Sequence, residues 1–408
     1  MYVFLPAAPH VRLLRLLRDQ GPVSRAELGD RLELSRPRLL AEVERLVAAE
    51  LIVEAGMAAS RGGRRSTLVE LDPRLRFAAV DLGATSIDVE LTNGRLEPLA
   101  AYQESADIRS GPRATLQRVN DLLAKARTDG VYDRLNGVGI GVPGPVSFRD
   151  GVPVSPPIMP GWDRYPVREL LTREYGCPAV VDNDVNIMAI GERHGGVARS
   201  VDDFLFVKIG TGVGCGIHLA GGVFRGVDGC AGDIGHIQVE AHGPACSCGN
   251  TGCLEALFGG AALARDALAA ARSGESPALA ARLEASTNGR RGDRPGSAAR
   301  VTLTARDVAD GAAEGDITCI RLIRDGGRRV GSVLATLVSF ANPSMIVIGG
   351  GLANLGHVLL AEIRSVVYRR SLPLATGNLP VVLSELGSRA GVTGAAVLAS
   401  DAVFEQAS

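Results

Sequence analysis

The chain of 408 residues is long enough for two or three domains, each with its own hydrophobic core. Its formal net charge of −1 excludes a strong field of one sign over the whole surface, so any contact with nucleic acid must come from a local basic patch. No apolar run is long enough for a membrane-spanning helix, and the seven cysteines lack the spacing of a secreted disulfide framework. The N-terminal residues lack the basic start and the cleavage site of a signal peptide, so we expect a cytoplasmic protein.

The N-terminal region has the pattern of a winged helix-turn-helix. Apolar residues at helical spacing fill residues 10–21, and Ser24 with Glu27 three residues later forms a capping box that starts a second helix. Ser35 starts a third helix, which carries leucine and valine on one face. Residues 51–73 follow as two predicted strands around a basic, glycine-rich tip, which is typical of a wing.

We therefore expect residues 1–75 to form a DNA-binding domain whose partner is double-stranded operator DNA. Arg36 and Arg38 begin the third helix, where proteins of this kind contact base edges in the major groove. The tip of the wing holds three more arginines that suit an adjacent groove or phosphates: Arg61, Arg64 and Arg65. The alternative is a small helical bundle used for dimerisation, because 12 arginines against 10 acidic residues give this region a net charge of only +2.

From Phe77 onward the chain alternates between strands and helices, which predicts an α/β fold. The first half begins with three strands in hairpin succession, and a second half repeats that arrangement. The predicted strands are residues 77–83, 87–92, 96–103, 136–142 and 178–184 in the first half, and 203–210, 213–220, 235–240 and 344–350 in the second. The predicted helices include residues 112–128, 184–196, 316–341 and 356–371.

Two glycine-rich loops occupy equivalent places in the two α/β halves. Residues 81–86 and 210–216 each join two strands of a predicted hairpin. Glycine lets backbone N–H groups approach an anion, the threonines add hydroxyl donors, and an aspartate at the first loop suits a magnesium ion held through water. The pair favours a site for nucleotide phosphates, with these candidate residues: Asp81, Gly83, Thr85, Gly210, Thr211 and Gly212.

Residues 181–186 end a buried strand and begin a helix. Polar side chains at the carboxyl end of such a strand face the crevice of an open α/β sheet. Asp184 lies at this point and suits a general base that takes a proton from a hydroxyl group as it attacks a phosphate. The alternative is that Asp184 only caps the following helix.

Residues 236–255 concentrate three cysteines and two histidines in a chain that has few of either. Cys246, Cys248 and Cys253 have the spacing C-x-C-x4-C, with glycines between them that permit tight turns. Three thiolates and one imidazole suit a closed tetrahedral zinc site with a structural role. The fourth ligand is His236 or His242, and the alternative is three free thiols in a loop.

These motifs together resemble the ROK family, which groups repressors, open reading frames and sugar kinases. The resemblance covers nearly the whole chain and rests on seven segments in order: DLGATS, GIGVPGPV, VDNDVN, GTGVGCGI, AGDIGHI, CSCGNTGCLE and VIGGGL. It implies a two-lobed actin-like ATPase fold, of the ribonuclease H-like kind, after an α+β winged domain. The first lobe is expected over residues 76–188 and 389–408, and the second over residues 189–388.

The resemblance also implies roles for individual residues. The family's zinc ligands correspond to His236, Cys246, Cys248 and Cys253, which selects His236 over His242. Its sugar-binding positions correspond to Asn183, Asp184, Asp233, His236 and Glu255. The catalytic base of the family's kinases corresponds to Asp184.

The functional expectation depends on three features: two departures from the pattern of the family's kinases, and the presence of the N-terminal domain. Ala84 and Ser86 replace a glycine and a lysine of the first phosphate loop, and Asp233 replaces a glutamate. Because stand-alone sugar kinases of the family lack a winged domain, we predict a sugar-responsive regulator, a repressor in carbohydrate metabolism, that binds sugar without turning it over. It is expected to form a homodimer or homotetramer and not to bind membranes. The alternatives are a hexose or N-acetylhexosamine kinase that uses Mg-ATP and carries a regulatory DNA-binding domain, and a zinc-stabilised protein that docks to a partner.

Overall fold

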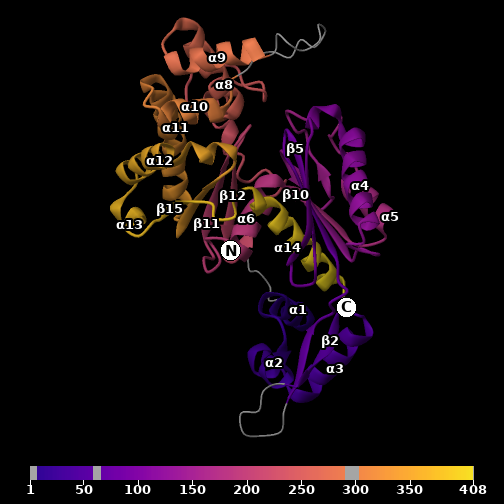
Figure 1. Ribbon diagram of the computed structural model, residues 1–408. Helices are drawn as coiled ribbons and strands as arrows, with labels where there is room; N and C mark the ends of the chain where they lie inside the picture. The colour runs from indigo at the N-terminus through magenta and orange to yellow at the C-terminus, as the bar shows by residue number, and fades with distance from the viewer. Residues whose placement is uncertain (1–6, 58–65, 290–302, 408) are drawn as a thin grey trace. The chain divides into compact units, whose positions relative to one another are not determined.

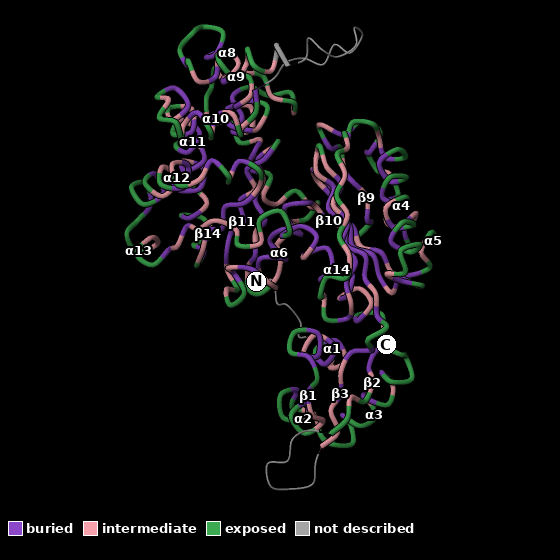
Figure 2. Tube along the Cα trace, in the orientation of Figure 1, coloured by how far each residue is buried: buried purple, intermediate pink, exposed green. Residues whose placement is uncertain are grey.

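The computed structural model describes residues 7–57, 66–289 and 303–407, which divide into two compact units. The first unit comprises Met1–His194 and Gly391–Ser408, and the second comprises Gly195–Ala390. Figure 1 traces the chain through both units, and Figure 2 shows the buried residues along each. Within the described residues, none of the helices combines the length and apolar character needed to cross a membrane.

The N-terminal part of the first unit contains three helices and a small antiparallel sheet with the order β1-β3-β2. Its elements are α1 (Pro9–Gln20), β1 (Val23–Ser24), α2 (Arg25–Leu32), α3 (Arg36–Ala48), β2 (Ile52–Met57) and β3 (Thr67–Leu71). Ser24 caps α2 by accepting the N–H of Glu27 at 3.2 Å, while the Glu27 carboxylate pairs with Arg31. This order of elements fits a winged helix-turn-helix. The tip of the wing, with Arg61, Arg64 and Arg65, lies outside the described residues.

The α/β part of the first unit is built on a five-stranded sheet with the order β10-β7-β4-β5-β6. Its strands are β4 (Phe77–Leu82), β5 (Ser86–Thr92), β6 (Pro98–Ser105), β7 (Gly137–Val142) and β10 (Ala179–Asn183), and a small ribbon adds β8 (Val146–Ser147) and β9 (Val152–Pro153). The strands β4, β5 and β6 are antiparallel neighbours, whereas β7 and β10 run parallel to β4.

Helices cover both faces of this sheet (Figure 1). Ala78 and Val80 of β4 face a core shared with α4 (Pro112–Thr128) and α5 (Val167–Tyr175). Ala79, between them, faces the opposite side, where it packs with α6 (Asp184–Gly195) and α14 (Ala390–Gln406). The alternation follows from the two-residue period of a strand, and it explains why β4 reads as a continuous apolar run.

The second unit repeats this topology. Its five-stranded sheet has the order β13-β12-β11-β14-β15, with antiparallel pairs on one side of β11 and parallel pairs on the other. The strands are β11 (Phe204–Ile209), β12 (Val213–Leu219), β13 (Gly222–Val223), β14 (Met345–Gly349) and β15 (Val381–Leu383). The predicted repetition is confirmed, and the fold is the two-lobed actin-like ATPase fold with an N-terminal α+β region.

Helices dominate the rest of the second unit. They are α7 (Leu254–Phe258), α8 (Gly260–Ser273), α9 (Pro277–Gly289), α10 (Ala305–Ala313), α11 (Ile317–Ala341), α12 (Gly356–Arg370) and α13 (Pro373–Thr376), with short 3₁₀ helices η1 (Ile108–Ser110) in the first unit and η2 (Ile234–His236), η4 (Gly351–Leu355) and η5 (Gly387–Arg389) in the second. Asp316 caps the long helix α11 by accepting the N–H of Cys319 at 2.9 Å. Gly327 and Gly331 of α11 let α12 approach closely, because a Cβ at either would press on a side chain of α12.

One expected strand is absent from the second unit. The predicted strand at residues 235–240 is instead the end of η2 followed by extended backbone, with a single bridge between Gln238 and Cys253. The backbone of this segment bonds irregularly to the loop that carries the cysteines: the N–H groups of Val239 and Glu240 both donate to the Gly252 carbonyl, at 2.8 and 3.2 Å. The alternating sequence reflects contacts with neighbouring loops and not a sheet.

Candidate functional site

Four side chains of the second unit converge on one point. They are His236 at the end of η2, Cys246 and Cys248 in the following loop, and Cys253 just before α7. Their ligand atoms all lie within 4.8 Å of one another. His236 Nδ1 lies 3.4 Å from Cys246 Sγ, and Cys248 Sγ lies 3.7 Å from Cys253 Sγ. The exposed His242 is not part of the group.

These distances fit a tetrahedral metal ion. With metal–sulfur bonds of about 2.3 Å, two thiolates of a tetrahedral site lie roughly 3.8 Å apart. The measured separation of Cys248 and Cys253 is 3.7 Å. A set of three cysteines and one histidine is of the soft type that zinc prefers and leaves no open position for water. The arrangement could therefore hold a metal that orders the loop.

The thiols themselves differ in their ease of ionisation. The backbone N–H of Asn250 lowers the pKa of Cys248, whereas burial raises the pKa of Cys253 to about 12. A buried thiol with so high a pKa stays protonated at neutral pH, and only a bound cation would offset the cost of its negative charge. Metal binding at this cluster should thus release a proton.

The loop that carries the cysteines is shaped by two glycines with positive φ, Gly249 and Gly252. Cys246 N–H donates to the Asn250 carbonyl at 2.8 Å, and Gly252 N–H donates to the Pro244 carbonyl at 2.8 Å. A Cβ at Gly252 would run into the Glu240 carbonyl oxygen, so a larger residue cannot take this position without moving the backbone. No apolar side chain between residues 238 and 252 is buried, so backbone hydrogen bonds hold the loop, and a metal at the cluster would add to them.

The same histidine links the cluster to two carboxylates. While His236 Nδ1 faces the cysteines, its Nε2 lies 3.9 Å from Asp233 Oδ1. A carboxylate on the far nitrogen of a ligating histidine is a common arrangement in metal sites. Glu255, in α7, accepts the backbone N–H of Val213 at 3.2 Å, and desolvation raises the pKa of its carboxyl group against the opposing effect of His236. Asp233, His236 and Glu255 therefore lie together beside the loop between β11 and β12.

The other two predicted sugar-binding residues belong to the first unit. Asn183 ends β10 and caps α6, since its Oδ1 accepts the N–H groups of Val185 at 2.9 Å and Asn186 at 3.2 Å. Its Nδ2 donates to the Gly144 carbonyl at 2.8 Å. Asp184 is the first residue of α6 and is 5% exposed. The capping role weighed for Asp184 is thus shared, because Asp184 Oδ1 also accepts the N–H of Val185, at 2.9 Å.

The two glycine-rich loops occupy corresponding turns of the two sheets. In the first, Gly83 N–H donates to the Ser86 carbonyl at 2.9 Å, and the Thr85 side chain is exposed. In the second, Gly210 N–H donates to the Gly212 carbonyl at 2.8 Å, and Thr211 is exposed. Asp81 is buried at the end of β4, where Gly391 of α14 leaves the space that its carboxylate fills.

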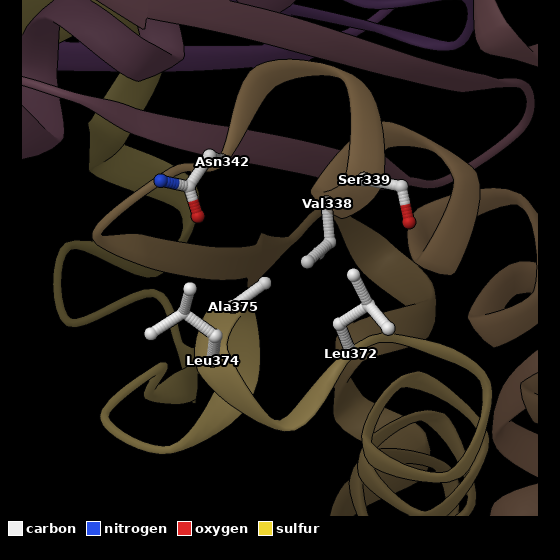
Figure 3. A pocket seen from close by; sticks show the side chains of 6 residues that line it. All are labelled: Val338, Ser339, Asn342, Leu372, Leu374 and Ala375. Atoms are coloured by element: carbon white, nitrogen blue, oxygen red, sulfur yellow. The ribbon is translucent and has the colours of Figure 1, made fainter.

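Among the described residues, two further regions, the start of α3 and a cavity in the second unit, lack a cluster of acids, bases or metal ligands. Arg36 and Arg38 are exposed in the first turn of α3. A cavity of about 480 Å³ lies in the second unit between the end of α11 and α13 (Figure 3). All of its lining residues are uncharged: Val338, Ser339, Asn342, Leu372, Leu374 and Ala375. It therefore offers no acid, base or metal ligand.

Comparison with known proteins identifies the lineage. The model of the ROK family matches residues 77–402. The chain belongs to the ROK family. A xylose repressor from Caldicellulosiruptor bescii is 28% identical over 388 residues, which cover 94% of this chain and 92% of the repressor. A glucokinase from Halalkalibacterium halodurans is 31% identical over 322 residues, which cover 78% of this chain and 93% of the kinase.

A solved structure is also similar over almost the whole length. The crystal structure of a ROK family transcriptional regulator, described as a homologue of the Escherichia coli protein MLC, has a TM-score of 0.79 and 25% sequence identity. The match covers 97% of this chain and 96% of that one. Regulators of the ROK family thus match the N-terminal region and both α/β lobes together.

Two residues near the candidate site escaped the sequence reasoning. Asp182, 1% exposed, accepts the N–H of Asn183 and the side-chain amide of Asn186 at 2.9 Å, so it holds the turn that presents Asp184. Val213 positions Glu255 through its backbone N–H, which no residue pattern can reveal. The run of polar residues at positions 182–184 of this ROK segment, directly after a buried strand, was the available signal for Asp182.

Proposed function

We propose that this ROK protein is a sugar-responsive, DNA-binding regulator of transcription that represses genes of carbohydrate metabolism. The observation that carries the proposal is the extent of the similarity. A xylose repressor and a ROK regulator match 94% and 97% of the chain, whereas the glucokinase matches 78%. The regulators therefore account for the N-terminal helices and small sheet, which the family model, beginning at residue 77, leaves out.

The N-terminal region supplies the DNA contacts in this proposal. The helix α3 would enter the major groove with Arg36 and Arg38 at its leading end, and the arginines of the wing would meet phosphates or the next groove. The side chains of Arg36 and Arg38 are exposed, as this requires. A homodimer or homotetramer would present two such regions to the two halves of an operator.

The sugar would be held by Asn183, Asp184, Asp233, His236 and Glu255. Carboxylates, an amide and an imidazole match the hydroxyl groups of a sugar, and each hydrogen bond to a charged group contributes roughly 1.5–3 kcal/mol. Several such bonds suffice for binding without a nucleotide. Zinc at the cysteine cluster would act structurally, because it would fix His236 and the segment leading to Glu255.

A kinase is the second candidate, and specific residues favour it. Asp184 follows β10 as the first residue of α6, at the carboxyl end of a sheet strand where a base could face the substrate, and the loop at Gly210, Thr211 and Gly212 has glycines that would admit a phosphate. Asp81 would then hold Mg-ATP with Gly83 and Thr85. The altered first loop weighs against this reading, since Ala84 and Ser86 replace the residues that cradle nucleotide in the kinases.

The proposal is tested by DNA binding. Full-length protein is used to select duplexes from a random pool, and the affinity for a selected duplex is measured by fluorescence anisotropy with and without D-xylose, D-glucose and N-acetylglucosamine. We expect one of these sugars to weaken binding about tenfold or more. Replacing Arg61, Arg64 and Arg65 by alanine should weaken binding and flatten its salt dependence, because fewer counterions are released. Replacing the exposed Arg173 in α5 by alanine is the control. If no duplex is selected, the protein is not the proposed DNA-binding regulator. If the salt slope is unchanged in the triple variant, the wing does not contact the DNA.

A further inference from the structure

The C-terminal helix α14 connects two distant parts of the first unit. Its first turns pack beside Asp81 and against α6, the helix that begins at the proposed sugar-binding residue Asp184: Gly391 faces the Asp81 carboxylate, and Gly394 lies against the backbone of Ile187 in α6. A Cβ at Gly394 would overlap the Ile187 carbonyl oxygen. Since no free space remains between the two helices, a shift of the first turns of α6 must move α14 as well.

The last turns of α14 belong to a different core. Ala399 and Phe404 are fully buried in the apolar cluster of the N-terminal region, with Leu13 and Leu17 of α1. The ring of Phe404 also lies under the guanidinium group of Arg18 at 5.9 Å. The DNA-binding region of the proposal is therefore incomplete without the end of a helix that starts next to Asp81.

Ion pairs join the same two helices. Arg18 of α1, 6% exposed, donates from Nη1 to Asp401 Oδ1 at 2.7 Å and to Ser400 Oγ at 2.8 Å. Arg15 binds the same carboxylate with two hydrogen bonds of 3.0 and 2.8 Å. We call Arg15, Arg18, Ser400 and Asp401 the coupling joint. Bidentate and buried pairs of this kind demand one geometry, whereas apolar packing alone tolerates many.

A second route reaches the same turn of α1. The helix α6 begins at Asp184, and His194 near its end lies 3.7 Å from Asp19 of α1. Arg18 Nε donates to Asp19 at 2.8 Å, so Asp19 and Asp401 both contact one guanidinium group. The helix α6, which starts at the proposed sugar-binding residue Asp184, and the helix α14, which packs against it, thus both end on the residues around Arg18.

We propose that α14 and the coupling joint transmit the state of the ligand site to the DNA-binding helices. A sugar hydroxyl that binds Asp184 would shift the first turn of α6. The helix α14 would move with it through the contact at Gly394, and the coupling joint would transmit this movement to α1. The inference rests on the proposed regulatory function and adds its route. It predicts that a protein with a broken coupling joint still binds DNA and still binds sugar, but that sugar no longer changes its affinity for DNA.

The test uses the full chain with Arg18→Met and Asp401→Leu combined, which replaces the pair by apolar side chains of similar size so that neither charge is left buried alone. The control is Glu405→Gln, which removes an exposed charge that pairs with Arg15 at 3.3 Å. Three quantities are measured: the affinity for a selected DNA duplex, the affinity for the sugar by calorimetry, and the ratio of DNA affinities without and with that sugar.

For the wild type and the control, the ratio is expected to be on the order of tenfold or more. For the double variant it should fall to within about twofold of unity, while the DNA and sugar affinities each stay within about threefold of the wild type. A double variant that keeps the full ratio overturns the inference and leaves the proposed function standing. A wild type that binds no DNA, or whose DNA binding ignores sugar, ends both. If the double variant unfolds, Asp401→Glu replaces it, because this variant keeps the charge but shifts the geometry of the ion pair. It should reduce the ratio of DNA affinities at least threefold, and an unchanged ratio in this variant also overturns the inference.

Discussion

The turn between β4 and β5 and the turn between β11 and β12 lie at the same place in two sheets of the same topology, yet different partners hold them. In the first turn, the carbonyl groups of Ala84 and Thr85 accept the N–H groups of Ile108 and Ala106, both at 3.1 Å. In the second, the carbonyl groups of Gly210 and Thr211 accept the N–H of Gly260, at 2.8 and 3.2 Å. The first turn is tied to the edge of its own sheet, whereas the second is tied to the start of α8.

The difference extends to the side chains. Ser86 donates to Asp88 at 3.1 Å next to the first turn, and the Ala84 methyl group packs against the core. The second turn instead approaches Glu255, which follows the cysteine cluster in sequence and accepts the N–H of Val213. The first turn is held by its own sheet and core, while the second lies beside Glu255 and a candidate metal site. Substitutions in the two turns should therefore have unequal effects on ligand binding.

The largest effect is expected from the cluster that supports the second turn. Cys248→Ala removes one of the proposed ligands, so bound zinc should fall from about one ion per chain to near zero, and sugar binding should be lost with it. Elemental analysis and calorimetry measure both. Cys230→Ala is the control, because Cys230 is an exposed cysteine outside the cluster. Protein prepared without chelator that holds no zinc would exclude the metal altogether.

A matched pair of glycine substitutions compares the turns directly. A Cβ at Gly212 would overlap the Glu255 carboxylate, whereas a Cβ at Gly83 would lie 2.8 Å from the small Ser86 hydroxyl. Gly212→Ala should thus displace Glu255 and weaken sugar binding by on the order of tenfold to a hundredfold, the loss of one hydrogen bond to a charged group. Gly83→Ala should change sugar binding less than about threefold. Equal losses in both variants, measured by calorimetry, would remove the distinction between the turns.

Asp184→Asn probes one of the two proposed sugar-binding residues of the first unit. The substitution keeps the size of the side chain and removes its charge, so sugar affinity should fall by on the order of tenfold while DNA binding without sugar is unchanged. Thermal unfolding checks that the buried position still folds. An unaltered sugar affinity would show that Asp184 does not contact the ligand.

The smallest effect is expected from Ser86→Ala. This variant removes only the hydrogen bond to Asp88 at the edge of the first turn, which contributes about 1 kcal/mol to the free energy of unfolding. Denaturant titration should detect this small loss of stability, and sugar binding should stay the same. A marked loss of sugar binding would show that the first turn contributes to the sugar site.

The sequence predicted most of what depends on local pattern. The hairpins, the buried strands and the repetition of the sheet follow from apolar runs separated by glycine turns, and the three cysteines of the cluster follow from ligand type and spacing. The choice of His236 over His242 came from the resemblance to the ROK family. The strand expected at residues 235–240 was wrong, because Val239 and Glu240 both donate to the carbonyl of Gly252 in the cysteine loop and form no ladder with a neighbouring strand in the described part of the chain. Alternation of apolar and polar residues alone cannot distinguish such a segment from an edge strand.

Contacts between residues far apart in the chain could not be predicted either, because no local pattern marks them. Asp401 lies 383 positions from Arg18 in the chain, and nothing around either residue indicates a partner. The role of α14 in two cores likewise depends on close approaches at Gly391 and Gly394, which read in the sequence as ordinary helix-weakening glycines. Tertiary packing, and not local preference, decides both.

The central claim is that sugar acts on DNA binding without being phosphorylated. A single titration tests it most directly: full-length protein on a selected, labelled duplex, with sugar and Mg-ATP present, while anisotropy and ADP release are recorded in the same sample. We expect a sugar-dependent change in anisotropy that needs no nucleotide, and no ADP above the level without sugar. Sugar-dependent ADP production that disappears in Asp184→Asn, with DNA binding indifferent to sugar, would contradict it and make this protein a kinase.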